Sequence, residues 1–253
     1  MVDLSGKTTL ITGAGQGVGF GIAVALSAAG ANVVLAGRTL AKVEEAAKEI
    51  EARGGNAIAV HCDVKDAASM QAALDATIKQ FSGLDILVNN AQEVPLGTLD
   101  DVTDEAFTAG FESGPLATFR FMKLARPHLA ARGGGTIINM CSSAGIRWYM
   151  AGYGPYGAVK QAIRVLTRAA ASEWGGENIR VLTIAPHAES PGLKWWIETN
   201  PDEAAAFFKT IPLGRIGALE TDIGQAVAAL CGPEFAYLTG ATIPLDGGQA
   251  NFD

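Results

Sequence analysis

The sequence predicts one α/β domain, a doubly wound parallel sheet of about seven strands with helices on both faces. Short runs rich in β-branched residues alternate along the chain with longer amphipathic segments. The short runs are apolar on both faces, which is typical of strands covered by helices on two sides. The chain has no linker, low-complexity segment or internal repeat, so residues 1–253 are expected to form a single domain.

The expected elements follow in an order that fits right-handed crossovers in a parallel sheet. The β-branched runs predict strands at residues 8–12, 32–36, 57–61, 86–89, 136–140, 180–185 and 241–245. Amphipathic spacing predicts helices at 40–53, 67–81, 104–131, 158–174 and 220–231, and another helix follows a glycine-rich turn at 13–19. The only long irregular stretch is 187–212, which is expected to form a substrate loop or lid.

Composition argues against several classes of protein. The hydrophobic fraction of 49% suits a large buried core, and a net charge of −7 without a basic run disfavours nucleic-acid binding. Three widely spaced cysteines fit a reducing cytoplasm better than a disulfide framework. Residues 8–37 carry no charge, but their seven glycines indicate a strand, a turn, a helix and a second strand rather than a membrane span. A cytoplasmic protein without membrane contact is expected.

Metal and serine-hydrolase chemistry are also disfavoured. The histidines, His61, His128 and His187, do not have metal-ligand spacing with the cysteines or carboxylates, so no metal is expected. The Gly-x-Ser-x-Gly pentapeptide of a nucleophile elbow does not occur.

A glycine-rich turn follows the first predicted strand and opens a helix. The N-terminus of a helix offers free N–H groups and a positive dipole end to a phosphate, and glycines let the backbone approach it closely. A purely structural turn is the alternative, but the strand–turn–helix–strand context favours dinucleotide binding. The turn residues expected to contact the cofactor are Gly13, Gln16, Gly17, Val18 and Gly19.

The end of the second predicted strand favours NADP(H) over NAD(H). An acidic residue there would bind the ribose hydroxyls, whereas an arginine accommodates a 2′-phosphate. The sequence places Arg38 at this point, with no carboxylate before Glu44. The alternative interpretation is that Arg38 is a solvated surface side chain.

Several motifs together resemble the short-chain dehydrogenase/reductase family over essentially the whole chain. They occur in the family's order: Thr12-Gly13-x-x-x-Gly17-x-Gly19, Cys62-Asp63-Val64, Asn89-Asn90-Ala91, the segment from Ile138 to Gly145, Tyr156-x-x-x-Lys160, Ile179-Arg180-Val181, Leu238-Thr239-Gly240 and Asp246-Gly247-Gly248. The resemblance implies a Rossmann-like fold and an oxidoreductase of the carbonyl reductase or alcohol dehydrogenase type. It also implies a homo-oligomer, a tetramer or a dimer.

Tyr156 and Lys160 are the expected acid/base pair. They are four residues apart at the start of a predicted helix, so their side chains lie on one face. A free tyrosine titrates near pH 10, and a shift of about 3 units to neutral pH needs roughly 4 kcal/mol in favour of the phenolate. The Lys160 ammonium and an oxidised nicotinamide are the expected sources of that stabilisation. The family resemblance implies that Lys160 also holds the nicotinamide ribose.

A serine is expected to bind the substrate oxygen beside Tyr156, and two serines compete for this role. Ser142 lies three residues before Gly145, as the family serine precedes its Ala-Gly, whereas Ser143 lies thirteen residues before Tyr156, a common family spacing. Ser142 is preferred because strand pairing fixes its register, while the following loop can take an insertion.

The resemblance assigns further cofactor contacts. Asp63 and Val64 would flank the adenine, and Asn90 and Ala91 would line the adenosine ribose side. Asp63 could instead cap the helix that follows it. Pro186 resembles the residue that begins the loop around the nicotinamide amide.

The sequence departs from the family pattern at four places. Gln92 and His187 each replace a glycine, and Pro191 replaces a threonine that often binds the carboxamide, which leaves Ser190 as a substitute. Gly114 stands where the family carries an asparagine that holds a proton-relay water. Pro115 should kink the helix there, so a freed backbone carbonyl of Phe111 or Gly114 is hypothesised to bind that water; the alternative is weakened turnover.

Aromatic residues predict a lipophilic or aromatic ketone or alcohol as substrate. The residues expected to contact it are Gln92, Ser143, Trp148, Tyr149, Tyr153, His187 and Trp195. Phe207 and Phe208 are expected to pack within a lid or a subunit interface rather than on substrate. The competing function is a protein of the same fold that binds the cofactor with non-redox chemistry or a sensing role and little turnover.

Overall fold

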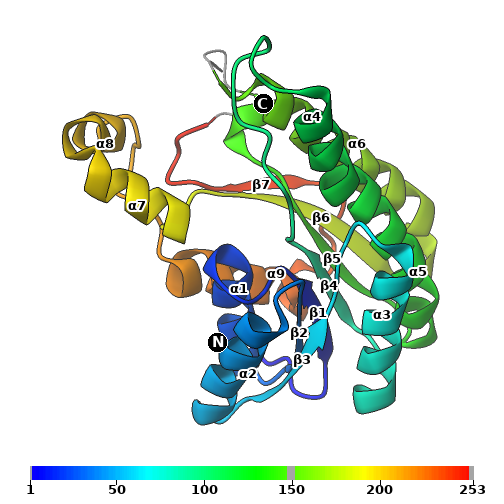
Figure 1. The fold of residues 1–253 in the computed structure, drawn as a ribbon. Helices are drawn as coiled ribbons and strands as arrows, with labels where there is room; N and C mark the ends of the chain where they lie inside the picture. The colour runs from blue at the N-terminus through cyan, green and yellow to red at the C-terminus, as the bar shows by residue number, and fades with distance from the viewer. Residues whose placement is uncertain (1, 147–151, 251–253) are drawn as a thin grey trace.

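A computed structural model describes residues 2–146 and 152–250. Its centre is a seven-stranded parallel sheet, in the order β3-β2-β1-β4-β5-β6-β7 (Figure 1). The strands are β1 Thr8–Thr12, β2 Asn32–Gly37, β3 Asn56–His61, β4 Ile86–Asn89, β5 Gly135–Met140, β6 Ile179–Pro186 and β7 Thr242–Leu245. The predicted doubly wound sheet of about seven strands is confirmed, and the strand ends differ from the predicted ones by one residue or none.

Helices cover both faces of the sheet, as the two-sided apolar pattern of the strands predicts. One layer consists of α1 Gly17–Ala28, α2 Leu40–Ala52 and α9 Gln225–Cys231. The other consists of α3 Ala67–Phe81, α4 Asp104–Phe111, α5 Ala117–Ala131 and α6 Gly154–Trp174 (Figure 1). Alternate residues of a strand point to opposite faces, so Ile11 of β1 belongs to the first core and Leu10 to the second.

The order of the strands creates a switch point next to β1. The chain leaves β1 toward β2 and β3 on one side and returns to β4 on the other. Helices after β1 and β4 therefore run on opposite faces, and a crevice opens at the carboxyl ends of the two strands. Ligands of doubly wound folds bind at this point.

The helix predicted at 104–131 is present with its predicted ends, but five of its residues, Glu112–Leu116, form a π-helical turn between α4 and α5. Pro115 lies inside this turn, has no N–H to donate and would clash with the carbonyl four residues earlier in an α-helix. The π-helical turn lies at the position where the sequence predicts a kink. A second π-helical turn, Leu219–Gly224, likewise precedes α9 within the helix predicted at 220–231.

The stretch 187–212 is not irregular. It contains two short helices, α7 Pro191–Thr199 and α8 Pro201–Phe208. Each helix has proline at its first position, where a missing N–H costs nothing. Ser190 also caps α7 by accepting the N–H of Leu193 at 3.3 Å. The two helices stand apart from the sheet on one side of its carboxyl edge (Figure 1). Among the described residues no helix is long and apolar enough to cross a membrane.

Candidate functional site

The glycine-rich turn lies at the carboxyl end of β1 and is fixed by the end of β4. Gly13 and Gly17 have φ angles of +66° and +60°, a region that side chains disfavour. The Thr12 hydroxyl accepts the N–H groups of Asn90 and Ala91, each at 3.0 Å. The Asn90 amide donates to the carbonyls of Thr12 at 2.9 Å and Gly13 at 3.1 Å. Asn90 therefore holds the turn in shape from the neighbouring strand.

The N-terminus of α1 opens onto this turn without a side-chain cap. Gln16 occupies the N-cap position, but its side chain makes no hydrogen bond to the helix N–H groups. Gly19 allows the close approach of strand and helix, because a Cβ there would lie 2.5 Å from the Asn90 amide nitrogen. Free N–H groups at a helix N-terminus suit an anion, so the turn fits the pyrophosphate of a dinucleotide.

A cavity of about 570 Å³ extends along the carboxyl ends of β1, β2, β3 and β4. Nine predicted contact residues line it: Gly13, Gln16, Gly17, Arg38, Asp63, Val64, Asn90, Ala91 and Gln92. Val18 instead packs against the core under α1. Lining residues that sequence reasoning did not assign to the cofactor include Thr39, Lys42, Lys65, Glu93 and Ser113. The cavity also reaches Ser190, the substitute suggested for the missing threonine.

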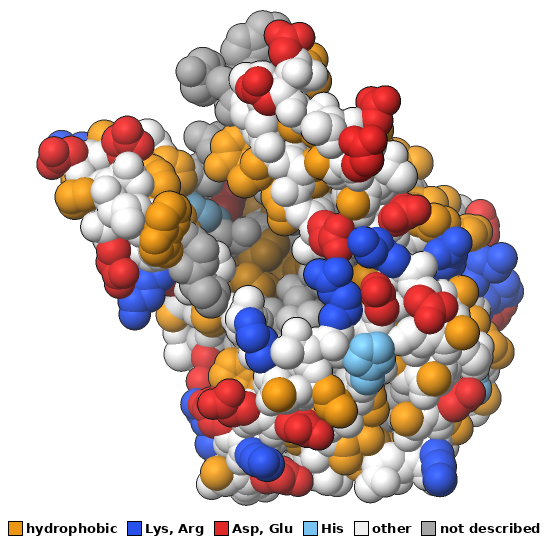
Figure 2. All heavy atoms as spheres, viewed as in Figure 1, with side chains coloured by type: hydrophobic (Ala, Val, Ile, Leu, Met, Phe, Trp, Pro, Cys, Tyr) orange, Lys and Arg blue, Asp and Glu red, His pale blue; other side chains and the backbone are white. Residues whose placement is uncertain are grey.

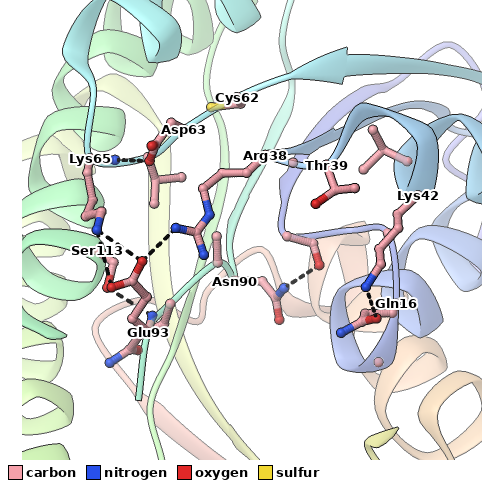
Figure 3. Close-up of a pocket in the computed structure, with 18 of the residues that line it drawn as sticks. Gln16, Arg38, Thr39, Lys42, Cys62, Asp63, Lys65, Asn90, Glu93 and Ser113 are labelled. Atoms are coloured by element: carbon pink, nitrogen blue, oxygen red, sulfur yellow. Dashed lines mark hydrogen bonds and ion pairs between the residues drawn. The ribbon is translucent and has the colours of Figure 1, made fainter. Parts of the chain in front are cut away.

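Three cationic side chains from separate elements line the cavity, with Lys65 beside Glu93 on one side and Lys42 beside Gln16 on the other (Figure 3). Arg38 follows β2, Lys42 lies in the first turn of α2, and Lys65 follows β3. The Arg38 guanidinium lies 2.7 Å from a carboxylate oxygen of Glu93, which is also 3.1 Å from Lys65 Nζ. Lys42 Nζ donates to the Gln16 amide oxygen at 3.3 Å. Arg38 and Lys65, joined through Glu93, thus form a cationic cluster at the cavity wall, in which the Arg38 side chain is 57% exposed.

Asp63 lines the cavity and does not cap α3. Its carboxylate accepts the N–H of Lys65 at 2.9 Å. The N-cap of α3 is Asp66, which accepts the N–H of Ala68 at 2.9 Å. The alternative interpretation of Asp63 as a helix cap is therefore wrong. Asp63 therefore lines the cavity from the loop after β3, where it could contact a cofactor.

Ser142, Tyr156 and Lys160 come together farther along the sheet edge. Ser142 follows β5, and its hydroxyl forms a hydrogen bond with Tyr156 in the first turn of α6. Lys160 Nζ lies 5.4 Å from the centre of the Tyr156 ring and donates to the Met140 carbonyl at 2.9 Å. The Lys160 side chain is buried. The geometry unites the three residues that the sequence selects for catalysis.

The pKa values of this trio depart from the expectation. Burial raises the pKa of Tyr156 to about 12 and outweighs the hydrogen bond from Ser142, which lowers it. Burial likewise lowers the pKa of Lys160 to about 8. Within the protein alone the pKa of Tyr156 is thus not lowered, and the expected lowering by Lys160 together with an oxidised nicotinamide stays a prediction. A protonated phenol beside a hydroxyl is a proton donor at neutral pH.

Of the residues predicted to contact substrate, Gln92 lines the cavity, whereas the other described ones do not. Ser143 begins a one-turn 3₁₀ helix, Ser143–Gly145, and Tyr153 precedes α6 with an exposed side chain. Trp195 on α7 is 65% exposed and is not among the residues that line the cavity. Trp148 and Tyr149 lie outside the described residues.

Aromatic contacts connect α7 and α8 to each other and to the residue after β6. His187, just after Pro186 at the end of β6, stacks edge-on against Phe207 of α8, with ring centres 5.3 Å apart. Phe207 also contacts Trp196 of α7 at 5.9 Å. His187 thus packs against α8, and Phe207 packs between His187 and Trp196 of α7.

Gln92 fills the space that Gly114 leaves empty. A Cβ on Gly114 would lie 3.2 Å from the Gln92 amide nitrogen and 2.8 Å from Val159 of α6. That amide nitrogen is buried without a hydrogen-bond partner among the described residues. The Gly114 carbonyl accepts the Ala117 N–H within the π-helical turn, so the turn itself supplies a partner to one of the two carbonyls hypothesised to bind water.

A twisted parallel sheet, an uncapped helix behind a glycine turn and a tyrosine–lysine pair define a dinucleotide-dependent oxidoreductase. A sequence model of the family described as enoyl-(acyl carrier protein) reductase matches residues 13–250. The 12α-hydroxysteroid dehydrogenase of a Clostridium species is 37% identical over 252 residues, 96% of each chain.

Solved structures agree with the sequence comparison. A 7α-hydroxysteroid dehydrogenase complexed with NADH and 7-oxo glycochenodeoxycholic acid superposes with a TM-score of 0.92 at 31% identity, covering 98% of this chain and 96% of the other. A variant of actinorhodin polyketide ketoreductase with NADPH gives a TM-score of 0.91 at 27% identity, covering 97% and 98%. The chain belongs to the short-chain dehydrogenase/reductase family and is an oxidoreductase acting on hydroxyl or carbonyl groups.

Proposed function

We propose that this protein is an NADP(H)-dependent oxidoreductase that interconverts a ketone or aldehyde with an alcohol, using Tyr156 as the general acid and base. The observation that carries the proposal is the Ser142–Tyr156–Lys160 arrangement at the same sheet edge as the glycine turn. Bound nicotinamide supplies or accepts the hydride. The protein's residues handle the proton and the substrate oxygen.

The three side chains suit separate tasks. Tyr156 is protonated at neutral pH because its pKa is raised to about 12, so it donates a proton to a carbonyl oxygen during reduction. Ser142 donates a second hydrogen bond to the same oxygen as negative charge develops there. Lys160 holds a positive charge behind the phenol and favours its ionised form when the proton leaves. Alcohol oxidation uses the same groups in reverse.

Positively charged side chains in the cavity support the proposed preference for NADP(H) over NAD(H). Arg38, Lys42 and Lys65 all line the cavity, although the protein carries a net charge of −7. A 2′-phosphate would receive bidentate hydrogen bonds from the arginine and point charges from the lysines. The solved relatives include one complex with NADH and one with NADPH, so the cationic cluster of this chain carries the proposal.

The proposed substrate is a lipophilic or aromatic ketone or its alcohol. Figure 2 shows a hollow between the α7–α8 lobe and the body of the molecule, with hydrophobic side chains inside it. Exposed apolar side chains from the loop after β4 and from the lid are Val94, Leu96, Leu99 and Trp195. A concave apolar site with few polar anchors suits such a substrate. One relative is a dehydrogenase of hydroxysteroids, which are molecules of this kind.

We further propose a cytoplasmic homo-oligomer, a tetramer or a dimer. The free thiols Cys62 and Cys141 are buried, as expected in a reducing compartment. Exposed Phe107, Phe119 and Val165 on α4, α5 and α6 offer an apolar face that a second copy could cover.

The experiment combines coenzyme titration with a panel of bulky ketones. NADPH should bind more tightly than NADH, and ketone reduction should consume NADPH. Tyr156→Phe should keep coenzyme binding and lose about 10²- to 10⁴-fold in kcat. Ser142→Ala should lose about 10²-fold or more, whereas Ser143→Ala should stay near wild type.

Three results would contradict the proposal. Undiminished reduction by Tyr156→Phe would remove the acid/base assignment, and tighter binding of NADH would remove the NADP(H) preference. Coenzyme binding without turnover of any ketone or alcohol would favour the sensing role instead.

A further inference from the structure

Glu93 holds together the two cations that the proposed function assigns to the cofactor. It follows β4, three residues after Asn90, and its carboxylate lies between elements that are far apart in sequence. One oxygen is 2.7 Å from Arg38 and 3.1 Å from Lys65, and the other is 3.3 Å from the same lysine. Figure 3 shows Arg38 and Lys65 pointing toward this carboxylate. All three residues line the cavity.

The backbone of Glu93 is fixed independently of its charge. Its N–H donates to the Ser113 hydroxyl at 2.9 Å, and that hydroxyl donates to the Ala109 carbonyl at 2.7 Å. Ser113 is buried in the π-helical turn. The carboxylate is therefore held at the cavity wall by β4 and by the Glu112–Leu116 turn, and a neutral side chain at position 93 would keep the same backbone.

The charge of Glu93 is present under ordinary conditions. Hydrogen bonds from Lys65 and then Arg38 hold the pKa of this carboxyl below its usual range. Both ion pairs remain partly open to solvent, with side-chain exposures of 57% for Arg38 and 31% each for Lys65 and Glu93. Such exposed pairs contribute little free energy and exchange readily. A stronger anion can therefore replace the carboxylate.

We propose that Glu93 is an internal competitor for the 2′-phosphate of NADP(H), occupying Arg38 and Lys65 until the phosphate displaces it. A phosphomonoester carries about −1.5 to −2 charges and three acceptor oxygens at neutral pH, against one charge and two oxygens for a carboxylate. The phosphate wins the two cations, but the displaced carboxylate stays nearby and repels it. Glu93 thereby lowers the discrimination between NADP(H) and NAD(H) that Arg38 and Lys65 would otherwise give.

This inference rests on the proposed function, since it presumes that the adenosine end of the coenzyme reaches the cationic cluster. It predicts a specific change in the ratio of two affinities. Glu93→Gln keeps the side-chain length and the backbone contact but removes the competing charge. The dissociation constant for NADPH should fall about tenfold, because repulsion between near charges in water is of this order. The constant for NADH should change much less.

The measurement is calorimetric or fluorescence titration, with adenosine 2′,5′-bisphosphate and AMP as a second pair of probes. These two nucleotides differ only in the 2′-phosphate, so they isolate its contribution from that of the nicotinamide half. Glu112→Gln is the matched control, because Glu112 is exposed on the same turn and does not line the cavity. It removes an equal charge and should leave the ratio of affinities unchanged.

A second variant separates the competitor from a general electrostatic effect. In Arg38→Gln the phosphate loses its bidentate partner, so the further gain from Glu93→Gln should shrink to a few-fold. Equal gains for NADPH and NADH, or for the bisphosphate and AMP, would overturn the inference. Weaker NADH binding by Glu93→Gln, with NADPH unchanged, would also overturn it and would indicate that Glu93 binds the ribose hydroxyls.

The outcome is distinguishable from a failure of the proposed function. If wild type prefers NADH, the proposed NADP(H) dependence is wrong, yet a shift of Glu93→Gln toward NADPH would still establish the competitor. If wild type prefers NADPH and Glu93→Gln leaves the ratio unchanged, the proposed function stands and the competitor does not.

Discussion

At the scale of a single residue, Lys160 is a charged side chain that is buried at a cost to the stability of the fold. Its side chain is 3% exposed, and its amine donates to the Met140 carbonyl. Burial disfavours the charged amine and lowers its pKa to about 8, so at neutral pH the protein still holds an ammonium in its interior at a cost. Such costs are typical of functional groups.

We therefore expect Lys160→Met to stabilise the protein while abolishing ketone reduction. The straight methionine side chain fills similar space without a charge, and the free energy of unfolding should rise by about 1–3 kcal/mol at pH 7. Denaturant unfolding and an activity assay on the same samples measure both effects.

The pH dependence of this gain has a definite sign. The folded pKa of Lys160, about 8, lies below the ordinary value of 10.5, so between these values the unfolded chain binds more protons. The stability of wild type should rise with pH through this window, and the advantage of Lys160→Met should shrink there. A variant less stable than wild type at pH 7 would contradict the burial argument.

At the scale of an element, the π-helical turn Glu112–Leu116 decides how α4, α5 and α6 meet. Its Gly114 faces Val159, the residue before Lys160, and leaves no room for a side chain. Pro115 removes the N–H that an α-helical ladder would use there. The turn thus brings Gly114 close to both Gln92 and Val159 of α6, next to the proposed catalytic residue Lys160.

We expect Gly114→Ala to destabilise the protein by up to about 2 kcal/mol. A new Cβ would lie 2.8 Å from a methyl group of Val159, and overpacking of this kind costs about 1–3 kcal/mol. That cost exceeds the gain of about 1 kcal/mol in helix propensity from replacing glycine by alanine.

Gly175→Ala is the matched control, because its φ of −57° is helical and a Cβ there meets nothing within 4 Å. It should raise stability by about 0.4–1 kcal/mol. Thermal denaturation of both variants decides the point. A stabilised Gly114→Ala would show that the turn tolerates a side chain.

At the scale of the whole molecule, the buried carboxylate of Asp85 connects several elements at the amino ends of the strands. Asp85, just before β4, accepts the Thr8 N–H at 3.0 Å and pairs with Lys7 at 3.1 Å. Arg132, after α5, lies 3.4 Å from the same carboxylate. Asp85 thus connects β1, β4 and α5 at the end of the sheet opposite the site, and its contribution is to stability rather than chemistry.

Asp85→Asn should lower the free energy of unfolding by about 1–3 kcal/mol, because charge-assisted hydrogen bonds of a buried group are lost. Asp75→Asn is the control, since Asp75 is exposed on α3 and accepts only from Gln71 among the bonds described. Urea unfolding should separate the two variants, and ketone reduction should persist in both. Equal stability would contradict the role of Asp85.

The sequence alone identified those features that depend on neighbours along the chain. Strand periodicity, the glycine turn and the spacing of Tyr156 and Lys160 are short-range patterns, and each reappears in the structure close to its predicted place. Helices α7 and α8 were predictable in principle, because Ser190 and two prolines mark their starts. The raised pKa of Tyr156 was not, since it depends on burial that only packing creates.

The tertiary structure decided which charges meet. Arg38 and Glu93 are 55 residues apart and belong to loops after different strands, yet they pair because the carboxyl ends of parallel strands share one edge. Gln92 and Gly114 meet in the same way: the Gln92 side chain lies where a side chain on Gly114 would otherwise be. Gly114 belongs to a π-helical turn that no periodicity indicates. Local sequence specifies backbone conformation through short-range sterics and hydrogen bonds, whereas the partner of a side chain is fixed only when the sheet brings distant loops together.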